Sequence, residues 1–168
     1  MRIIPKSDYR ETSWKNGGGS TTEIYLAGGD RFDWRVSIAT VSASGPFSNF
    51  AGYDRHIMVL EGDGMSLEVD GKLRVLVPMT PFSFSGDSPA TGHLINGPVR
   101  DFNLMVCREF GVGRLSFVNE SRFVSGVSSL LVHHLKGHSV LLEPGDEFHL
   151  EAPENVVLCE VTPHQQRG

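Results

Sequence analysis

Turn-forming residues recur at short intervals along nearly the whole chain, and this spacing constrains the fold more than any other feature. Glycine lies beside aspartate, asparagine, proline, serine or lysine at 28–30, 44–46, 61–64, 70–71, 85–87, 96–98, 136–137 and 144–146. The runs between these turns are short, and they alternate apolar with polar residues or are rich in β-branched residues, as at 34–39, 102–107 and 156–161. The pattern predicts an all-β barrel or sandwich. A helical turn is expected only within 7–13 or 119–123.

Two parts of the chain repeat the same order of features. Residues 61–84 and, in a shorter form, residues 131–150 both have a strand, a tight turn, a second strand and a further strand that starts near proline. This order is typical of a small double-stranded β-helix, so we expect two stacked cupin-like barrels (a bicupin-like, all-β fold). Residues 1–110 would form an N-terminal barrel with a ligand pocket. Residues 111–168 would form a smaller barrel that serves as scaffold, and strands can exchange between the two barrels.

Size and charge exclude several classes of function. The chain has 168 residues, a formal net charge of −5 and no cluster of lysine and arginine, so its attraction for nucleic acid is weak. No apolar run approaches the roughly 20 residues of a membrane span, and the first residues do not resemble a signal peptide, so we expect a cytoplasmic protein. Cys107 and Cys159 lie in apolar runs and are expected to be buried free thiols. Exposed sheet edges are compatible with a homodimer.

A glycine-rich stretch, Trp14-Lys15-Asn16-Gly17-Gly18-Gly19, precedes a predicted strand. Three glycines beside a cation let backbone N–H groups approach a bound group closely, which suggests a site. A flexible hairpin loop is the alternative. A phosphate-binding loop fits poorly, because the lysine precedes the glycines and no helical pattern follows them.

Two predicted strands each have a polar face. At 34–39 this face holds Arg35, Ser37 and Ala39, and at 101–107 it holds Asp101, Asn103 and Met105. Such a face is often exposed to solvent. Two details favour the inside of a barrel instead. The polar groups are arginine, aspartate and asparagine, which form ion pairs or bidentate hydrogen bonds, and the two faces end in alanine and methionine. We expect Asp101 to hold Arg35, which leaves Arg55 or Lys15 to bind a carboxylate.

Five ordered motifs, at 14–19, 32–39, 45–50, 52–55 and 97–105, together resemble the HutD/Ves family of bacterial cupin-like proteins. The resemblance covers most of the first two thirds of the chain and is loose in the last third. It implies a two-barrel cupin-like fold without established enzymatic activity. For HutD members it implies a regulatory or metabolite-binding role in histidine utilisation, and for Ves members only a vague link to stress.

The residues also bear on metal binding. Metal-dependent cupins use an H-x-H pair with a nearby glutamate and a further histidine, because alternate strand residues converge on one ion. This chain has no H-x-H, and Asp54-Arg55-His56 stands near the expected ligand positions. A cation there would repel a metal ion and attract an anion, so we expect no metal and no cofactor. A metal set of His149, Glu147 and either His133 or His134 is kept as the alternative.

We therefore expect a non-enzymatic protein that binds a small anionic metabolite, a carboxylate such as urocanate or N-formylglutamate. The cations would bind it, the amides, the hydroxyl and the glycine backbone would orient it, Asp101 would hold a cation, and the aromatic rings would exclude water. The expected ligand-binding residues are Trp14, Lys15, Asn16, Gly17, Gly18, Arg35, Ser37, Phe47, Phe50, Arg55, Asp101 and Asn103.

Two alternatives to this interpretation stay open. One is a cupin-like enzyme, either a metal-dependent dioxygenase or a metal-free isomerase or epimerase that uses His56, Lys15, Glu23 or Asp101 as acid and base. The other is a structural or partner-binding protein that responds to no ligand. No catalytic residue is assigned.

Overall fold

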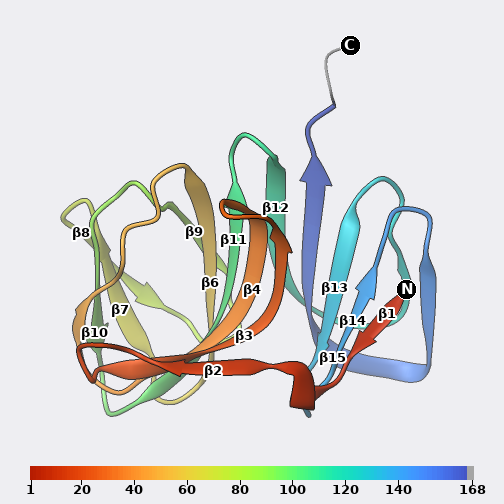
Figure 1. Ribbon diagram of the computed structural model, residues 1–168. Coiled ribbons are helices and arrows are strands. Elements are labelled where there is room, and N and C mark those ends of the chain that lie inside the picture. Colours follow the sequence, from red (N-terminus) through yellow and green to blue (C-terminus); the bar gives the residue numbers. More distant parts are fainter. Residues whose placement is uncertain (166–168) are drawn as a thin grey trace.

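The computed structural model describes residues 1–165, which form antiparallel β-strands and one short 3₁₀ helix (Figure 1). The predicted all-β, cupin-like fold is confirmed. The elements are β1 Arg2–Ile4, η1 Lys6–Asp8, β2 Arg10–Ser13, β3 Gly19–Gly28, β4 Phe32–Val41, β5 Gly45–Pro46, β6 Tyr53–Glu61, β7 Met65–Val69, β8 Lys72–Leu76, β9 Phe82–Ser85, β10 Ala90–Leu94, β11 Val99–Cys107, β12 Gly111–Val124, β13 Ser129–His134, β14 Ser139–Leu142 and β15 Glu147–Pro163.

The strands form three sheets. A six-stranded sheet has the order β2-β3-β4-β11-β6-β9, a four-stranded sheet the order β5-β10-β7-β8, and a five-stranded sheet the order β1-β14-β13-β15-β12. Figure 1 shows the first two sheets as one half of the molecule and the strands β13, β14 and β1 as the other, with β12 and β15 passing between them. We call the six-stranded and four-stranded sheets together the first barrel, and the five-stranded sheet the second barrel.

Apolar side chains join the two barrels into one body. One face of the six-stranded sheet, with Trp34, Val36 and Phe102, packs against Leu131 and Leu141 of the five-stranded sheet. A separate apolar cluster lies between the six-stranded and four-stranded sheets, and a third fills the second barrel. The six-stranded sheet is therefore covered on both faces, which explains why β11 is almost entirely buried.

The first strand of the chain belongs to the second barrel. Arg2, Ile3 and Ile4 of β1 pair with Leu141, Val140 and Ser139 of β14, and the chain then crosses to the first barrel through β2 (Figure 1). The N-terminal strand is thus exchanged between the two halves. The division of the chain at 1–110 and 111–168 stays a prediction.

The tight turns follow the sequence signals. Asp70 and Gly71, between β7 and β8, have φ angles of 50° and 77°, the left-handed conformation that an Asp-Gly hairpin turn requires. At Glu143–Asp146 the Asp146 N–H donates to the Glu143 carbonyl at 3.0 Å, with Pro144 and Gly145 at the two central positions. These turns fix the register of the strands on either side.

The helical expectations are partly wrong. Residues 119–123 lie within β12, where an irregular register near Ser121 interrupts the pairing with β15. The strand pairing with β15 on both sides of this irregularity outweighs the polar composition of the segment, so the segment is extended. Near 7–13 the helix is confined to Lys6–Asp8, and β2 starts at Arg10.

Other expectations concern the thiols and the membrane. Cys107 and Cys159 are buried free cysteines, as predicted. Among residues 1–165, no helix has both the length and the apolar character needed to cross a bilayer.

Candidate functional site

A cavity of about 450 Å³ opens in the first barrel, between the six-stranded sheet and the segment around β5. Its size falls within the range of small-molecule sites. It is lined by Ser13, Trp14, Lys15, Asn16, Thr21, Arg35, Ser37, Ala39, Val41, Pro46, Phe47, Ser48, Phe50, Arg55, Asp101, Asn103 and Met105. Ten of the twelve expected ligand-binding residues are therefore brought to one cavity, the exceptions being Gly17 and Gly18.

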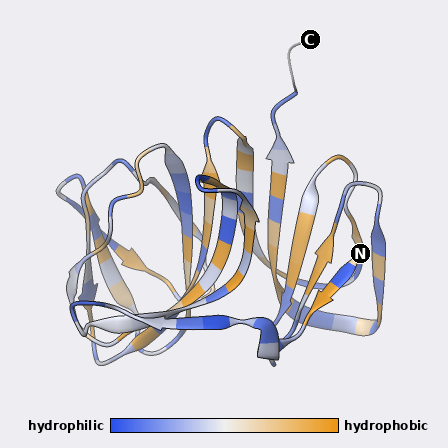
Figure 2. Ribbon diagram, viewed as in Figure 1, coloured by the Kyte–Doolittle hydropathy of each residue, from blue (hydrophilic) through white to orange (hydrophobic). Residues whose placement is uncertain are grey.

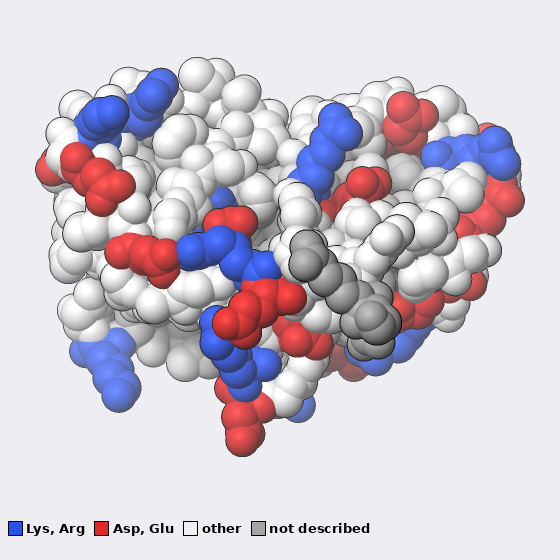
Figure 3. All heavy atoms as spheres, turned by 90° about the horizontal axis from the view of Figure 1, so that it is seen from above, with Lys and Arg blue, Asp and Glu red and all other residues white. Residues whose placement is uncertain are grey.

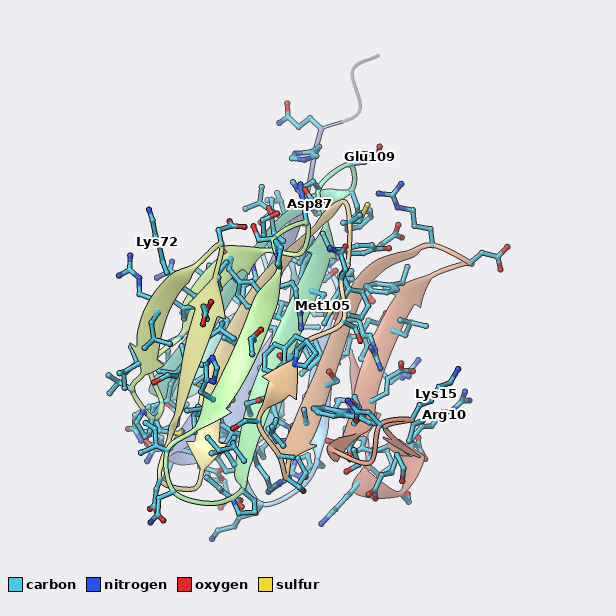
Figure 4. The ribbon with its side chains drawn as sticks, turned by 90° about the vertical axis from the view of Figure 1, so that its left-hand side faces the viewer. Arg10, Lys15, Lys72, Asp87, Met105 and Glu109 are labelled. Carbon is cyan, nitrogen blue, oxygen red and sulfur yellow. The ribbon has the colours of Figure 1, made fainter. Side chains whose placement is uncertain are left out.

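Alternate residues of β4 and β11 make the floor of this cavity. Ser37 pairs with Asn103, and Arg35 pairs with Met105, so the polar faces of the two strands lie side by side. Their other faces, with Val36 and Leu104, pack into the core shared by the two barrels. The prediction that these polar faces point into a barrel is confirmed. Figure 4 shows Met105 in the middle of the strands and Lys15 at the margin of the molecule.

Arg55 is the cation at the floor. It stands on β6 opposite Met105, and its side chain is only 7% exposed. Its Nη1 donates to the Ser48 carbonyl at 3.1 Å, while its Nε is buried without a hydrogen-bond partner in the described part of the chain. Burial lowers the pKa of Arg55 to about 10, the charge of Asp101 opposes this and Arg35 adds to it. The guanidinium remains charged at neutral pH.

Aromatic rings surround that guanidinium. Its carbon lies 4.9 Å from the ring centroid of Phe84, 5.1 Å from that of Phe50 and 5.8 Å from that of Phe47. Such rings stabilise the cation through their π faces and keep water away from it. Phe47 reaches this place because residue 92 is glycine: a Cβ there would stand 2.8 Å from the Phe47 ring.

Arg35 has a different partner from the one expected. Its Nε donates to Glu23 Oε2 at 3.0 Å, on the neighbouring strand β3, rather than to Asp101. The reason is the register, because both β3 and β11 lie beside β4. Glu23 stands opposite Ser37, two residues from Arg35, whereas Asp101 stands opposite Ala39, four residues away. Glu23 therefore neutralises Arg35, and Arg55 is the buried cation that could bind an anionic ligand.

Asp101 is the most enclosed polar group of the floor, with 1% of its surface exposed. Its Oδ1 accepts a hydrogen bond from Asn103 Nδ2 at 2.5 Å, and within residues 1–165 its Oδ2 has no partner. Burial raises the pKa of Asp101 to about 7, against the opposite effects of the Asn103 hydrogen bond and the Arg55 charge. The carboxyl group thus changes charge near neutral pH.

The rim is formed by the loop between β2 and β3. Lys15 and Asn16 are exposed there, and Trp14 is half-buried, with its indole Nε1 donating to Thr21 Oγ1 at 2.8 Å. That hydrogen bond fixes the indole beside the entrance of the cavity. Lys15 supplies a mobile positive charge at the same entrance.

The glycines of this loop are structural. Gly18 N–H donates to Asn16 Oδ1 at 2.8 Å and Gly17 N–H donates to the Trp14 carbonyl at 3.1 Å, so both amides are used within the loop, and neither residue lines the cavity. Gly19 is required because a Cβ there would stand 2.2 Å from the Thr40 carbonyl oxygen and 3.1 Å from the Trp14 ring. The glycines let Trp14 fold over the start of β3.

Sequence reasoning missed five lining residues, namely Ser13, Thr21, Val41, Pro46 and Ser48. Ala39 and Met105 are placed on the inward faces by the same period of two that selects Arg35 and Asp101, although they are not among the expected ligand-binding residues. Ser48 takes part through its carbonyl oxygen, which side-chain patterns do not reveal. Phe84 reaches Arg55 from the edge strand β9, which pairs with β6.

The candidate acid–base and metal residues are only partly in the cavity. His56 faces away from it, bonded through Nδ1 to Ser83 Oγ at 2.6 Å, and burial lowers its pKa. His149 is bonded to Glu147 at 2.7 Å, whereas His133 is buried against Ser139. Among residues 1–165, no group of three or more His, Cys, Asp or Glu side chains is placed to hold a metal ion.

Comparisons with known proteins place this arrangement in a family. A family model described as HutD matches residues 6–167. The chain is 43% identical over 152 residues to an uncharacterised 21.2 kDa protein in the hutC 3′ region of Pseudomonas putida, a match that covers 88% of this chain and 80% of that protein. It is 38% identical over 96 residues to protein Ves of Escherichia fergusonii, which covers 55% of this chain and 50% of that one.

A solved structure agrees over the full length. HutD from Pseudomonas fluorescens SBW25, in a structure described as a formate condition, has a TM-score of 0.85 and 36% sequence identity, and the match covers 98% of this chain and 99% of that one. The chain therefore belongs to the HutD family, and the family predicted from the five motifs is confirmed.

Proposed function

We propose that this member of the HutD family binds a small carboxylate in the cavity of its first barrel and acts in histidine utilisation as a regulator rather than as a catalyst. The observation that carries the proposal is Arg55, a buried cation that lines the cavity and has an unsatisfied Nε–H. A buried cation is costly unless a partner compensates it. A ligand carboxylate is the partner that the planar fork of an arginine fits best.

The surroundings of Arg55 favour tight binding of such a ligand. Because aromatic rings and apolar strands keep water away, an ionic hydrogen bond at this place is stronger than the same bond in water. Arg35 is already neutralised by Glu23, so an anion would pass Lys15 at the entrance and then bind to Arg55.

The names of the relatives support the choice of pathway. One relative is described by its place beside hutC, and another is HutD itself, in a structure that refers to formate, the smallest carboxylate. Urocanate and N-formylglutamate are carboxylates of that pathway and small enough for a cavity of about 450 Å³. The similarity to Ves makes a role in a stress response the variant of this proposal.

Isothermal titration calorimetry tests the proposal with urocanate, N-formylglutamate, glutamate and formate at millimolar concentrations. We expect at least one of them to bind, and we expect Arg55→Ala to abolish the heat. Arg74→Ala is the matched control, since Arg74 is an exposed arginine on β8, outside the cavity. No heat with any of the four ligands, or an unchanged affinity in Arg55→Ala, would refute the proposal.

One observation favours a catalytic function as the second candidate. Asp101 is buried, lines the cavity and has a pKa near 7, which suits a group that accepts and donates a proton. A metal-free isomerase or epimerase would exchange a carbon-bound hydrogen of its ligand. Proton NMR of each ligand in D₂O with the protein detects that exchange, and Asp101→Asn should stop it. If no ligand exchanges or changes, the catalytic alternative fails.

Nucleic acid is not among the partners that we propose. The formal net charge is −5, and the upper face in Figure 3 mixes acidic with basic side chains. Ion pairs offset part of the positive charge, since Arg108 lies 2.6 Å from Asp87 and 3.3 Å from Asp54. A homodimer through an exposed sheet edge is compatible with the proposal, and light scattering after gel filtration measures it.

A further inference from the structure

Two buried polar atoms at the floor of the cavity lack a hydrogen-bond partner within residues 1–165. One is Nε of Arg55 and the other is Oδ2 of Asp101. Since neither has a partner, these two atoms do not satisfy each other. The floor therefore presents an unsatisfied donor and an unsatisfied acceptor at separate places.

The two residues that pair directly with Asp101 in the neighbouring strands offer no donor to its Oδ2. In the six-stranded sheet Asp101 pairs with Ala39 of β4 on one side and with Val59 of β6 on the other, and both side chains are apolar. Asn103 already serves the other oxygen, Oδ1. A donor for Oδ2 has to come from the cavity, which Asp101 lines.

The two unsatisfied groups lie apart along the sheet. Arg55 pairs with Met105, which is four residues from Asp101 on β11, and four residues of strand span about 13 Å. Each of the two charges still affects the pKa of the other group, but no hydrogen bond joins Arg55 Nε to Asp101 Oδ2. One ligand group of two or three atoms would therefore leave one end of the floor unsatisfied.

Charge makes the second contact necessary. An anion bound to Arg55 draws on the same positive charge that partly offsets Asp101. A ligand that brings only a carboxylate would thus place two anions in a site of low dielectric constant. A ligand that also brings a hydrogen-bond donor would stabilise the Asp101 carboxylate in place of the Arg55 charge that the anion has neutralised.

We propose that the ligand class of this cavity is a carboxylate that also carries a hydrogen-bond donor, such as an amide N–H, a few bonds away. The carboxylate meets Arg55 and the donor meets Oδ2 of ionised Asp101. This inference rests on the proposed carboxylate site and adds the second contact to it. A cavity of about 450 Å³ has room for both groups, since one water molecule in the liquid occupies only about 30 Å³.

Three matched probes test the second contact by calorimetry at pH 8, where Asp101 is mostly ionised. N-acetylglycine has an N–H that is replaced by CH₂ in levulinate and by an oxygen atom in acetoxyacetate, with the rest of the molecule unchanged. We expect N-acetylglycine to bind about 10- to 100-fold more tightly than levulinate, because a hydrogen bond to a buried charge is involved. Acetoxyacetate should bind no better than levulinate, because its oxygen faces the Asp101 carboxylate.

Two variants locate the effect. In Asp101→Asn the preference for N-acetylglycine should fall below about threefold, with levulinate unchanged or bound more tightly because a negative charge is gone. In Arg55→Ala all three probes should be lost. The preference in the wild-type protein is decisive by itself, so the test does not depend on the folding of the aspartate variant.

The outcomes separate this inference from the proposed function. Equal affinities for N-acetylglycine and levulinate, with both lost in Arg55→Ala, would overturn the donor contact and leave the carboxylate site standing. A preference for N-acetylglycine that persists in Asp101→Asn would also overturn the donor contact. Binding of none of the probes would overturn both.

Discussion

The two barrels are built from similar strand pairs, yet their interiors have opposite character. In the first barrel β4 and β11 turn one face to the shared apolar core and the other to the cavity, where Arg35, Ser37 and Asp101 lie. In the second barrel β13 and β14 turn one face to the same core, but Leu130 and Leu142 fill the other side. Figure 2 shows hydrophilic bands along β4 and a mostly hydrophobic β14.

This difference distinguishes an interior that stabilises the fold from an interior that could bind a ligand. An apolar interior stabilises a barrel, whereas buried polar groups with unsatisfied atoms cost stability. The second barrel demonstrates that a filled interior is compatible with this architecture. The polar interior of the first barrel supports our proposal that a ligand satisfies its groups.

The largest expected effect is a loss of stability when the apolar interior of the second barrel is truncated. Leu142→Ala removes a fully buried side chain from the second barrel, and we expect a loss of about 2–5 kcal/mol in the free energy of unfolding, as for other buried leucines. The affinity for carboxylates should change less than about twofold at temperatures where the protein stays folded. Urea denaturation and calorimetry measure the two quantities. A large change in affinity would show that the second barrel is more than scaffold.

The opposite result is expected in the first barrel. Arg55→Met should reduce carboxylate affinity by more than about 100-fold, or about 2.8 kcal/mol. The free energy of unfolding should fall by no more than about 1 kcal/mol, because a flexible apolar side chain packs well among Phe47, Phe50 and Phe84. A severe loss of stability with retained binding would mean that Arg55 is structural.

The dependence of stability on pH should differ in sign between a group of the cavity and one at the junction of the barrels. The folded pKa of Asp101 is raised to about 7, so between about pH 4 and pH 7 the folded state holds a proton that the unfolded state has lost. Its contribution to stability therefore decreases as the pH rises through this window. Burial lowers the folded pKa of His133 to about 4, so its contribution increases with pH between about 4 and 6.5.

Single variants expose these opposing slopes. Relative to the wild type, Asp101→Asn should become more stable as the pH rises from 4 to 7, and His133→Gln should become less stable as it rises from 4 to 6.5. Denaturation at several pH values measures both differences. Slopes of the same sign in the two variants would contradict the assigned burial of one of them.

The smallest expected effect tests the contrast between the two arginines of the cavity. Glu23→Gln removes the partner of Arg35 and leaves its positive charge free, so carboxylate affinity should rise by about three- to tenfold. The free energy of unfolding should change by less than about 1 kcal/mol, since both side chains are partly exposed. A weaker affinity would show that Glu23 itself contacts the ligand.

Much of the fold and of the cavity could be predicted from the sequence, because both depend on local periodicity. Turn residues such as Asp70-Gly71 mark the strand ends, and the period of two in β4 and β11 correctly assigns Arg35 and Asp101 to one face. The interpretation of the second barrel as scaffold stays a prediction, and its apolar interior is consistent with it.

The rest depends on contacts between distant strands. The pairing of Arg35 with Glu23 follows from the register between β3 and β4, which no local pattern contains. The glycines at 17 and 18 have the composition of a binding loop, but their N–H groups are used by Asn16 and Trp14. His56 stands beside Arg55 in the sequence, and strand alternation places it on the opposite face.

Both proposals depend on a carboxylate held by Arg55 inside the first barrel. A crystal structure of the protein soaked with N-acetylglycine would show this contact. We expect density for the ligand in the cavity, with a carboxylate oxygen about 2.7–2.9 Å from a guanidinium nitrogen of Arg55. A cavity that holds only water at saturating ligand concentration, or a ligand whose carboxylate points away from Arg55, would contradict it.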